Sequence, residues 1–332
     1  MPLERRRQLS LFPEAERVGP AEPALGSARL RARLPSRLRL GTSSWSFPGW
    51  AGIVWHRVHS EERLARDGLP AYASHPLLRT VGLDRTFYAP LSSHAFAAYA
   101  AQVPDEFRFV VKAHEACTLA LFPQGARGGG APGAANPRFL DAAYASEAVV
   151  APFVEGLGAK GAALVFQFPP QDAGGLGGPD AFAERLYRFL AALPPGPAYA
   201  VEIRTASWLT PRYAHALADA GAVHCLTVHP AMPDLPTQVR VAAPALGGLC
   251  VVRWMLRAGA SYEAARQRYR PFDQILDEDA ATRSDVAAVC LAAGERRIAT
   301  YVVANNKAEG CAPLTLLRLA EEIAASRAAS RA

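Results

Sequence analysis

The segment Val201–Trp208 joins an apolar run to side chains that could carry chemistry. Glu202 and Arg204 are two residues apart, so on a strand both point to the same face. A carboxylate beside a guanidinium can act in acid/base catalysis or in anion binding. It can also be an internal ion pair of the fold, and both interpretations stay open.

Seven other apolar runs of strand length also end in polar or aromatic residues. Cations outnumber carboxylates among them, which favours an anionic ligand such as a phosphate or a carboxylate. Glu202 and Asp84 are the candidate catalytic acid/base groups. The residues expected to bind substrate are Trp45, Tyr88, Lys112, His114, Gln167, Arg204, Trp208, Arg253, Asn305, Asn306, Lys307 and Glu309.

Each of these side chains also has a structural explanation. The aromatic rings could fill the mouth of a barrel, and Asn305-Asn306 could cap a helix or shape a turn. His114, His229 and Glu202 could together bind a divalent metal, but no H-x-x-x-H or similar spacing supports that site. No metal and no cofactor is therefore predicted.

The apolar runs predict eight strands, separated by helices with recognisable starts. The strands are expected at Leu38–Thr42, Leu78–Leu83, Phe107–Lys112, Ala162–Phe168, Ala198–Arg204, Ala222–Val228, Leu249–Trp254 and Ile298–Ala304. The helices are expected at Ala95–Gln102, Asn136–Leu157, Ala181–Ala192, Tyr213–Ala220, Ala280–Ala293 and from Ala312 to about Ala325.

Alternation of strands and helices predicts an α/β protein with a parallel sheet. Eight such units favour a (β/α)8 TIM barrel with loop insertions, whose active site lies at the carboxyl ends of the strands. A doubly wound open sheet is disfavoured, because no glycine-rich dinucleotide turn follows the first strand.

Composition sets the class of protein. The chain has 332 residues, half of them hydrophobic, with 36 basic and 30 acidic residues. Nine arginines and four glutamates fall in the first forty residues, so 36 − 9 = 27 basic and 30 − 4 = 26 acidic residues remain. A nearly neutral body argues against a broad nucleic-acid-binding face. Five scattered cysteines without a C-x-x-C pair favour a cytoplasmic protein, and no run is long enough to span a membrane.

The chain divides into an N-terminal arm at 1–36, a barrel domain at 37–327 and a short tail at 328–332. The arm is rich in Pro, Glu, Arg and Ala without sustained periodicity, which predicts disorder.

One island in the arm, Gln8-Leu9-Ser10-Leu11-Phe12, resembles the pentapeptide by which bacterial DNA polymerases and repair proteins bind the DNA sliding clamp. Leu11 and Phe12 would enter an apolar cleft while Gln8 forms hydrogen bonds at its rim, and Leu9 completes the partner-binding set. The alternative is that Leu9, Leu11 and Phe12 attach the arm to the barrel.

Six segments, in order along the chain, together resemble the YecE-like family (domain-of-unknown-function family 72). They are Gly41–Trp50, Thr86-Phe87-Tyr88, Phe107–Ala113, Phe166–Pro170, Val201–Arg204 with Ser207-Trp208, and Asn305–Gly310. The resemblance implies a TIM barrel and implies no particular activity. Compared with the family pattern, this chain has Gly82 in place of a glutamate, Asp84 in place of an asparagine, and Met255-Leu256 in place of a His-Gly pair.

The leading hypothesis is an enzyme that acts on a phosphorylated or nucleotide-like substrate, linked to DNA metabolism through the pentapeptide. One alternative is a sugar-phosphate isomerase or lyase unrelated to DNA. A second is a non-catalytic nucleic-acid-binding module. The expected partners are an anionic small molecule or nucleic acid and the sliding clamp, without a membrane.

Overall fold

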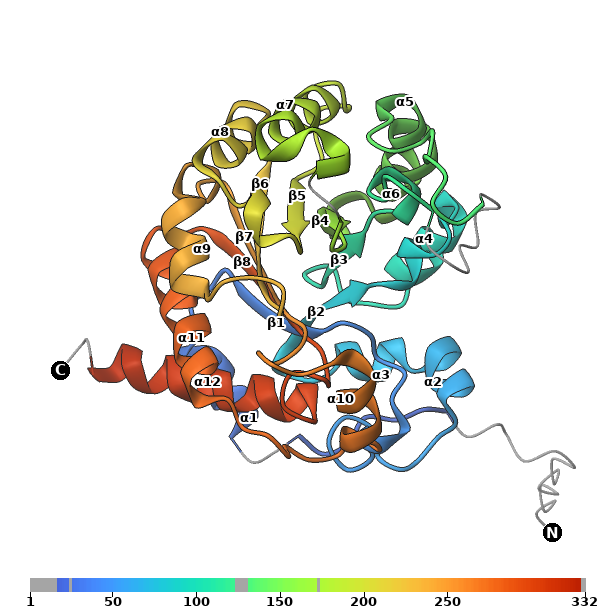
Figure 1. Ribbon diagram of the computed structural model, residues 1–332. Coiled ribbons are helices and arrows are strands. Elements are labelled where there is room, and N and C mark those ends of the chain that lie inside the picture. Colours follow the sequence, from blue (N-terminus) through green and yellow to red (C-terminus); the bar gives the residue numbers. More distant parts are fainter. Residues whose placement is uncertain (1–16, 24–25, 123–130, 172–173, 330–332) are drawn as a thin grey trace, which may run out of the picture.

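The computed structural model describes residues 17–23, 26–122, 131–171 and 174–329, and within them eight strands form a closed barrel (Figure 1). Every neighbouring pair is parallel, and pairing of the first strand with the last closes the barrel. The strands are β1 (Leu38–Thr42), β2 (Leu78–Leu83), β3 (Arg108–Lys112), β4 (Gly161–Phe168), β5 (Tyr199–Ile203), β6 (Val223–Val228), β7 (Leu249–Trp254) and β8 (Ala299–Ala304). The predicted (β/α)8 TIM barrel is confirmed.

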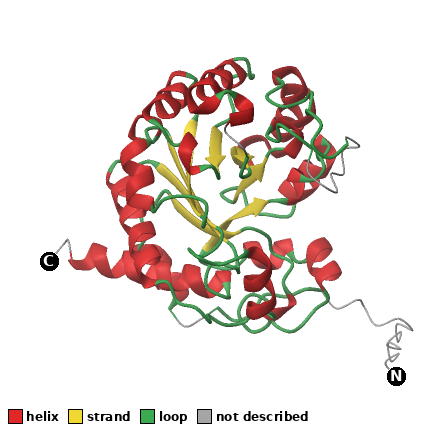
Figure 2. Ribbon diagram, in the orientation of Figure 1, coloured by secondary structure: helices red, strands yellow, loops and turns green. Residues whose placement is uncertain are grey.

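Helices surround the strands as an outer ring (Figure 2). They are α1 (Ser27–Arg33), α2 (Glu61–Asp67), α3 (Leu69–Ala73), α4 (Ser93–Ala100), α5 (Ala142–Ala145), α6 (Ala151–Leu157), α7 (Gly178–Ala191), α8 (Pro211–Asp219), α9 (Leu235–Val241), α10 (Tyr262–Tyr269), α11 (Ala280–Glu295) and α12 (Ala312–Ala329). Short 3-10 turns follow several strands at their carboxyl ends, among them Arg85–Phe87 after β2 and Ala206–Trp208 after β5.

Local sequence explains where the helices begin. The Thr210 hydroxyl accepts a hydrogen bond from the Tyr213 amide at 3.1 Å, and Pro211 occupies the first helical position of α8. Ser92 caps α4 in the same way through the Ala95 amide. In both helices the N-cap side chain satisfies an amide that has no partner within the helix.

Two hydrophobic layers fix the direction of the strand side chains. A large core lies between strands and helices, and a smaller one, which includes Val110, Val165, Ala200, Val251 and Val303, fills the inside of the barrel. Because strand side chains alternate between faces, the residues two positions further along each of these strands also point inward. The inner core therefore determines which polar residues meet at the carboxyl end.

The predicted helix Asn136–Leu157 is wrong in its first part. Residues 136–141 are not helical, because the Asn136 amide donates to the carbonyls of Ala116 (2.8 Å) and Leu119 (2.7 Å) and so fixes a turn. The helix begins only after Asp141, which caps α5.

The prediction of disorder is wrong for residues 17–23 and 26–36. Residues 27–33 form α1, and both Val18 and Leu34 are buried. The Ala21 amide donates to the Val54 carbonyl at 2.8 Å. These apolar residues pack on the barrel, which offsets the entropy lost on ordering. The pentapeptide at residues 8–12 lies outside the described residues.

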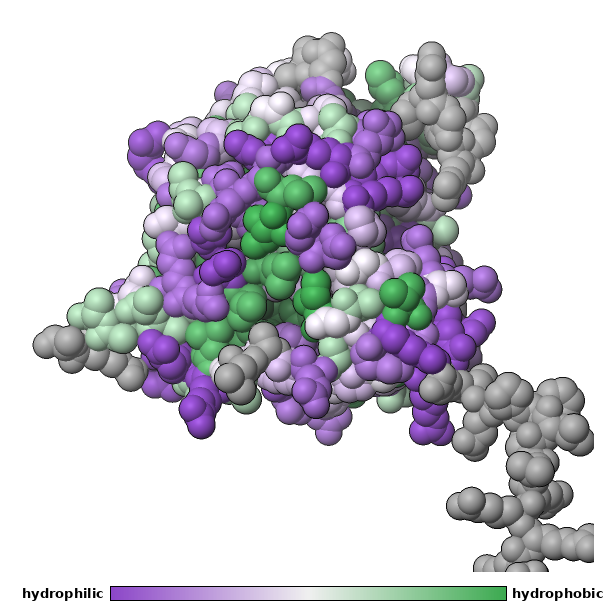
Figure 3. Space-filling model, turned by 90° about the horizontal axis from the view of Figure 1, so that it is seen from below, coloured by the Kyte–Doolittle hydropathy of each residue, from purple (hydrophilic) through white to green (hydrophobic). Residues whose placement is uncertain are grey.

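Seen from below, the surface is largely hydrophilic around a central area of hydrophobic residues (Figure 3). In the part of the chain that the structure describes, no helix has the length and apolar character that crossing a bilayer requires. All five cysteines are buried and free.

Candidate functional site

Polar side chains from successive strands form a layer inside the barrel, next to its carboxyl end. Gln167 of β4 lies beside Glu202 of β5, and Thr227 of β6 lies beside Arg253 of β7 in the strand register. Each of these four residues lies two positions beyond an inward-facing apolar residue of its own strand, so the alternation that fills the core also gathers the polar layer.

Glu202 is the centre of an ion network. It has no solvent exposure, and its Oε1 accepts from Arg204 Nε at 2.8 Å and from the Thr227 hydroxyl at 3.3 Å. Its Oε2 accepts from Nη1 of Arg253 at 2.6 Å. Nη2 of Arg253 reaches across to Asp84 at the end of β2, at 2.7 Å from each carboxylate oxygen. Arg253 therefore joins opposite sides of the barrel through two carboxylates.

These contacts decide the ionisation of Glu202. Burial alone would raise the pKa of this carboxyl, but the guanidiniums of Arg253 and Arg204 outweigh burial and hold the pKa well below its usual range. Burial likewise disfavours the charged form of Arg253, yet Asp84 and Glu202 together raise its pKa above the usual value. Glu202 is thus a fixed anion near neutral pH, a poor proton donor that orients two arginines. Asp84, whose side chain is 33% exposed, is the accessible carboxylate of the network.

Lys112 ends β3 within reach of the same charges. Its ammonium lies 3.5 Å from the centre of the Phe87 ring. Among the described residues the amine forms no ion pair or hydrogen bond that would hold its charge. Burial lowers the pKa of Lys112 to about 7, with Arg253 and Arg204 acting in the same direction and Asp84 opposing them.

Lys307 lies beyond the end of β8, where Asn305 positions it. Lys307 Nζ donates to Asn305 Oδ1 at 3.1 Å, and the Asn305 amide donates to the Ser43 hydroxyl at 2.8 Å. The ammonium lies 4.3 Å from the centre of the Tyr262 ring in α10. This cation therefore has a neutral amide and a ring as its partners, and no carboxylate among the described residues.

Gln167 is 2% exposed, and its Nε2 is buried without a hydrogen-bond partner in the described part of the chain. An unsatisfied buried donor costs stability, so its position beside Glu202 needs an explanation. A ligand oxygen that reached this depth would supply the missing acceptor.

Two histidines lie at the rim. His114 Nδ1 is 2.6 Å from the Tyr144 hydroxyl, and burial and Arg138 lower the pKa of His114. His114 also lines a hollow of about 220 Å³ together with Leu119, Asn136 and neighbouring residues. Burial, followed by Arg204, lowers the pKa of His229 to about 4, so both imidazoles are neutral at physiological pH.

Four residues predicted to bind substrate lie outside the polar layer. They are Trp45, Trp208, Asn306 and Glu309. The Trp208 ring is fully buried and stacks on Phe182 of α7 at 3.9 Å between ring centres. The Trp45 indole donates to the Leu64 carbonyl at 3.0 Å in the outer core. Both rings fill space between strands and helices, as the structural explanation held, which corrects the expectation that they face a ligand. Tyr88 is 54% exposed.

Asn306 and Glu309 hold loops in place. The Asn306 carbonyl oxygen accepts from the Trp50 indole at 3.2 Å and from the Ala312 amide at 2.8 Å, where α12 begins. Glu309 is fully buried and accepts from the Asp279 amide at 2.7 Å. In the structure, these two residues therefore cap a helix and hold loops, and they do not face the polar layer.

Sequence reasoning missed three residues of the site: Phe87, Thr227 and Tyr262. Thr227 could have been found, because it occupies the inward-facing position of β6 at the level of Glu202. Phe87 lies inside the Thr86-Phe87-Tyr88 segment, but nothing in the sequence marks which of its two rings faces Lys112. Tyr262 approaches only because the long loop after β7 folds back over β8, and no local pattern predicts that contact.

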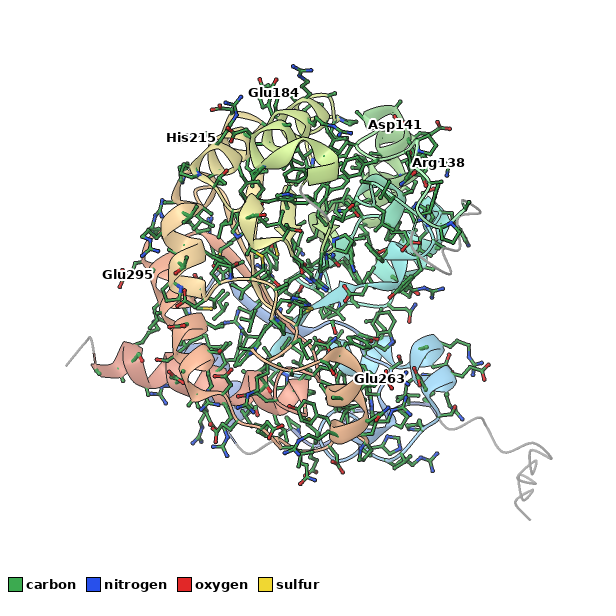
Figure 4. The ribbon with its side chains drawn as sticks, viewed as in Figure 1. Arg138, Asp141, Glu184, His215, Glu263 and Glu295 are labelled. Atoms are coloured by element: carbon green, nitrogen blue, oxygen red, sulfur yellow. The ribbon has the colours of Figure 1, made fainter. Side chains whose placement is uncertain are left out.

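We identify the candidate site by its network of charged side chains and not by the size of a cavity. Hollows of about 320 and 500 Å³ lie at the opposite end of the barrel, where they are lined by residues such as Arg37, Arg297 and Arg327. The labelled polar side chains Glu184, His215 and Glu295 point outward from the helical ring (Figure 4), whereas the network around Glu202 lies inside the ring of strands. Within the described residues, no group of three or more His, Cys, Asp and Glu side chains could hold a metal ion.

Comparison with known proteins now adds the family. The solved structure of a DUF72 family protein from Thermotoga maritima MSB8 is similar over 86% of this chain and 98% of that chain, with 20% identity and a TM-score of 0.55. A DUF72 family protein from Enterococcus faecalis V583 is similar over 86% of this chain and 95% of its own, with 17% identity and a TM-score of 0.52. At this identity the likeness shows the fold alone. No curated protein matches the chain.

The model of the family described as "Protein of unknown function DUF72" matches residues 39–332, which include the barrel and every described residue of the ion network. The chain therefore belongs to the DUF72 family.

Proposed function

We propose that the protein is an enzyme that acts on a small anionic substrate, of the phosphate-bearing kind, bound at the carboxyl end of the barrel. The observation that carries the proposal is the imbalance of charge in the polar layer. Glu202 and Asp84 are both engaged by arginines, while Lys112 and Lys307 have no carboxylate partner among the described residues. An anion would compensate the charge of Lys307 and that of the protonated fraction of Lys112.

The contacts assign different roles to the predicted residues. Glu202 orients Arg204 and Arg253, and its depressed pKa makes it a positioning residue. Asp84, partly exposed and held at both oxygens by Arg253, is the carboxylate that could exchange a proton with substrate. Arg204 has a side chain 19% exposed, and its Nε and Nη2 both contact Glu202 Oε1 at 2.8 Å.

Two further polar residues extend the proposed binding surface. Gln167 lies in β4, and Asn305 directly follows β8. Gln167 brings an amide donor that has no acceptor in the described part of the chain, and Asn305 fixes the position of Lys307. Donors arranged in this way around a bound phosphate oxygen would orient it without further reorganisation.

A neutral amine favours the lyase alternative over hydrolysis of a nucleotide. The Lys112 amine can add to a carbonyl carbon, a step common in sugar-phosphate chemistry and of no use in phosphate ester hydrolysis. A nucleic-acid-binding module would instead present its cations on an open groove, and these lie inside the barrel mouth. The link to DNA metabolism depends on residues 8–12 alone.

Thermal unfolding with a panel of sugar phosphates, nucleotides and simple carboxylates tests the proposal. At a ligand concentration about 100 times Kd, binding to the native state adds about 2.7 kcal/mol and raises Tm by several degrees. Lys307→Gln should reduce the shift. The matched control Arg212→Gln removes one charge from a side chain that is 58% exposed on α8, and it should keep the full shift.

Two outcomes contradict the proposal. One is the absence of a shift with every compound of the panel. The other is an equal loss of the shift in Lys307→Gln and Arg212→Gln, which would indicate general electrostatic attraction without a site.

A further inference from the structure

Lysine is scarce in this chain and concentrated at the site. Of 36 basic residues only Lys112, Lys160 and Lys307 are lysines, and the rest are arginines. Two of the three lie at the carboxyl end of the barrel. Arginine is permanently charged and serves anion binding well, whereas lysine can lose its proton and become a nucleophile. In a chain that otherwise uses arginine, two of the three amines therefore lie where an amine could have a chemical use.

The three amines have different surroundings. Lys160 donates to the carbonyls of Ala100 (2.9 Å) and Val103 (2.8 Å) and lies 3.4 Å from Asp105, contacts that hold its proton. Lys307 donates to Asn305. The Lys112 amine lies 3.5 Å from the centre of the Phe87 ring, and it has no hydrogen-bond acceptor among the described residues.

We infer that Lys112 is a nucleophile that forms an imine with a carbonyl group of the substrate. The inference rests on the proposed function, because it takes the same site and names the substrate class as phosphate-bearing aldehydes or ketones. It adds a covalent step at a stated atom, Lys112 Nζ.

The step balances as follows. The neutral amine adds its electron pair to the carbonyl carbon, a carbon–nitrogen bond forms, and the carbonyl oxygen becomes a hydroxyl by taking a proton from nitrogen. The hydroxyl then leaves as water with one proton from solvent, and a protonated imine remains. Nothing is oxidised or reduced.

The charges that face the amine keep it available. Arg253 from β7 and Arg204 from β5 disfavour a further positive charge, while Asp84 from β2 and Glu202 from β5 favour one. Burial decides the balance and lowers the pKa of Lys112 to about 7. Close to half of the amine is then neutral at pH 7, against on the order of 1 in 1,000 for an ordinary lysine. The protonated imine would carry the same charge as the ammonium. Asp84 and Glu202, which favour the ammonium, would therefore also stabilise the protonated imine.

Borohydride trapping on the full-length protein tests the inference. The protein is incubated with glyceraldehyde 3-phosphate or pyridoxal 5′-phosphate as probes, then reduced, digested and analysed by mass spectrometry. We expect modification of Lys112 at least ten times faster than of Lys160 or Lys307, with a rate that is half-maximal near pH 7. Lys112→Arg should abolish this label, and the matched variant Lys160→Arg, outside the site, should keep it.

Equal labelling of the three lysines, or a rate at Lys112 that rises only towards pH 10, overturns the inference. The control probe is propionaldehyde, which has no phosphate. If phosphates raise Tm but Lys112 is not labelled, the imine is wrong and the anion site stands. If Lys112 is labelled equally well by propionaldehyde and no phosphate raises Tm, the amine chemistry stands and the anion site is wrong.

Discussion

Glu202 shows how burial and charge together decide what a carboxylate can do. From sequence it was the first candidate for acid/base catalysis, with an internal ion pair as the alternative. The structure gives it two arginine partners and no solvent, and its pKa is depressed. Its electrostatic environment therefore agrees with the ion-pair alternative, and Asp84 and Lys112 are the groups left for proton transfer and bond formation.

Replacing Glu202 by Gln should destabilise the fold. The amide keeps the shape but leaves Arg253 and Arg204 without their counter-charge, and breaking a buried pair costs about 3–5 kcal/mol. Urea unfolding of Glu202→Gln against wild type measures this difference. The control Glu184→Gln changes an outward-pointing residue that is 43% exposed, and it should cost well under 1 kcal/mol.

The same variant, Glu202→Gln, should change how the free energy of unfolding depends on pH in the acid range. The folded pKa of Glu202 lies below the unfolded value of about 4.3, so the unfolded state binds the proton first. The contribution is fully present above about pH 5 and is lost as pH falls below the unfolded value. The wild type should lose stability more steeply than Glu202→Gln between about pH 5 and pH 3, and parallel curves would contradict the role given to Glu202.

At the scale of elements, the strands could be predicted from the sequence. The positions of the residues that follow each strand could be predicted only in part. All eight strands lie within a residue or so of the expected bounds, because apolar runs of this length that end at polar residues have few other uses. Residues on the strands themselves, such as Gln167, Glu202 and Arg253, point where alternation predicts. Beyond the last paired residue alternation stops, and the loop conformation decides.

Trp208 and Asn306 illustrate that limit. Trp208 follows Glu202 by six residues, but the 3-10 turn at Ala206–Trp208 directs its ring outward into the helical layer. Asn306 is adjacent to Asn305, yet it faces Trp50 and the start of α12 while Asn305 faces Ser43. Such choices depend on packing partners far away in sequence, which one chain without its fold does not reveal.

The pentapeptide at residues 8–12 is an element whose role stays a prediction. A labelled peptide of residues 1–20 should bind a bacterial DNA sliding clamp with Kd of roughly micromolar order, about −8 kcal/mol. Changing Leu11 and Phe12 together to Ala should abolish binding, because the apolar anchors carry most of the energy of such short peptides. Absence of binding at roughly tens of micromolar wild-type peptide would remove the link to DNA metabolism.

At the scale of the whole molecule, the barrel has two basic ends with different character. At the amino ends of β1, β2 and β3 lie Arg39, Arg79 and Arg108, near Glu106. Burial lowers the pKa of Arg39, with like charge from Arg108 and Arg79 acting in the same direction and Tyr301 and Glu106 opposing them. At this end Arg79 pairs with Glu106 at 3.0 Å, and the Lys160 amine, directly before β4, donates to two backbone carbonyls and lies 3.4 Å from Asp105.

The most direct test is therefore to ask where an oxyanion binds. Crystals soaked in tungstate, a phosphate analogue with strong anomalous scattering, would show its position without any assumption about the reaction. We predict anomalous density at the carboxyl end, within hydrogen-bond distance of at least two of Lys112, Arg204 and Lys307. Density confined to the arginines at the amino end, with the carboxyl end empty at the same tungstate concentration, would contradict the account.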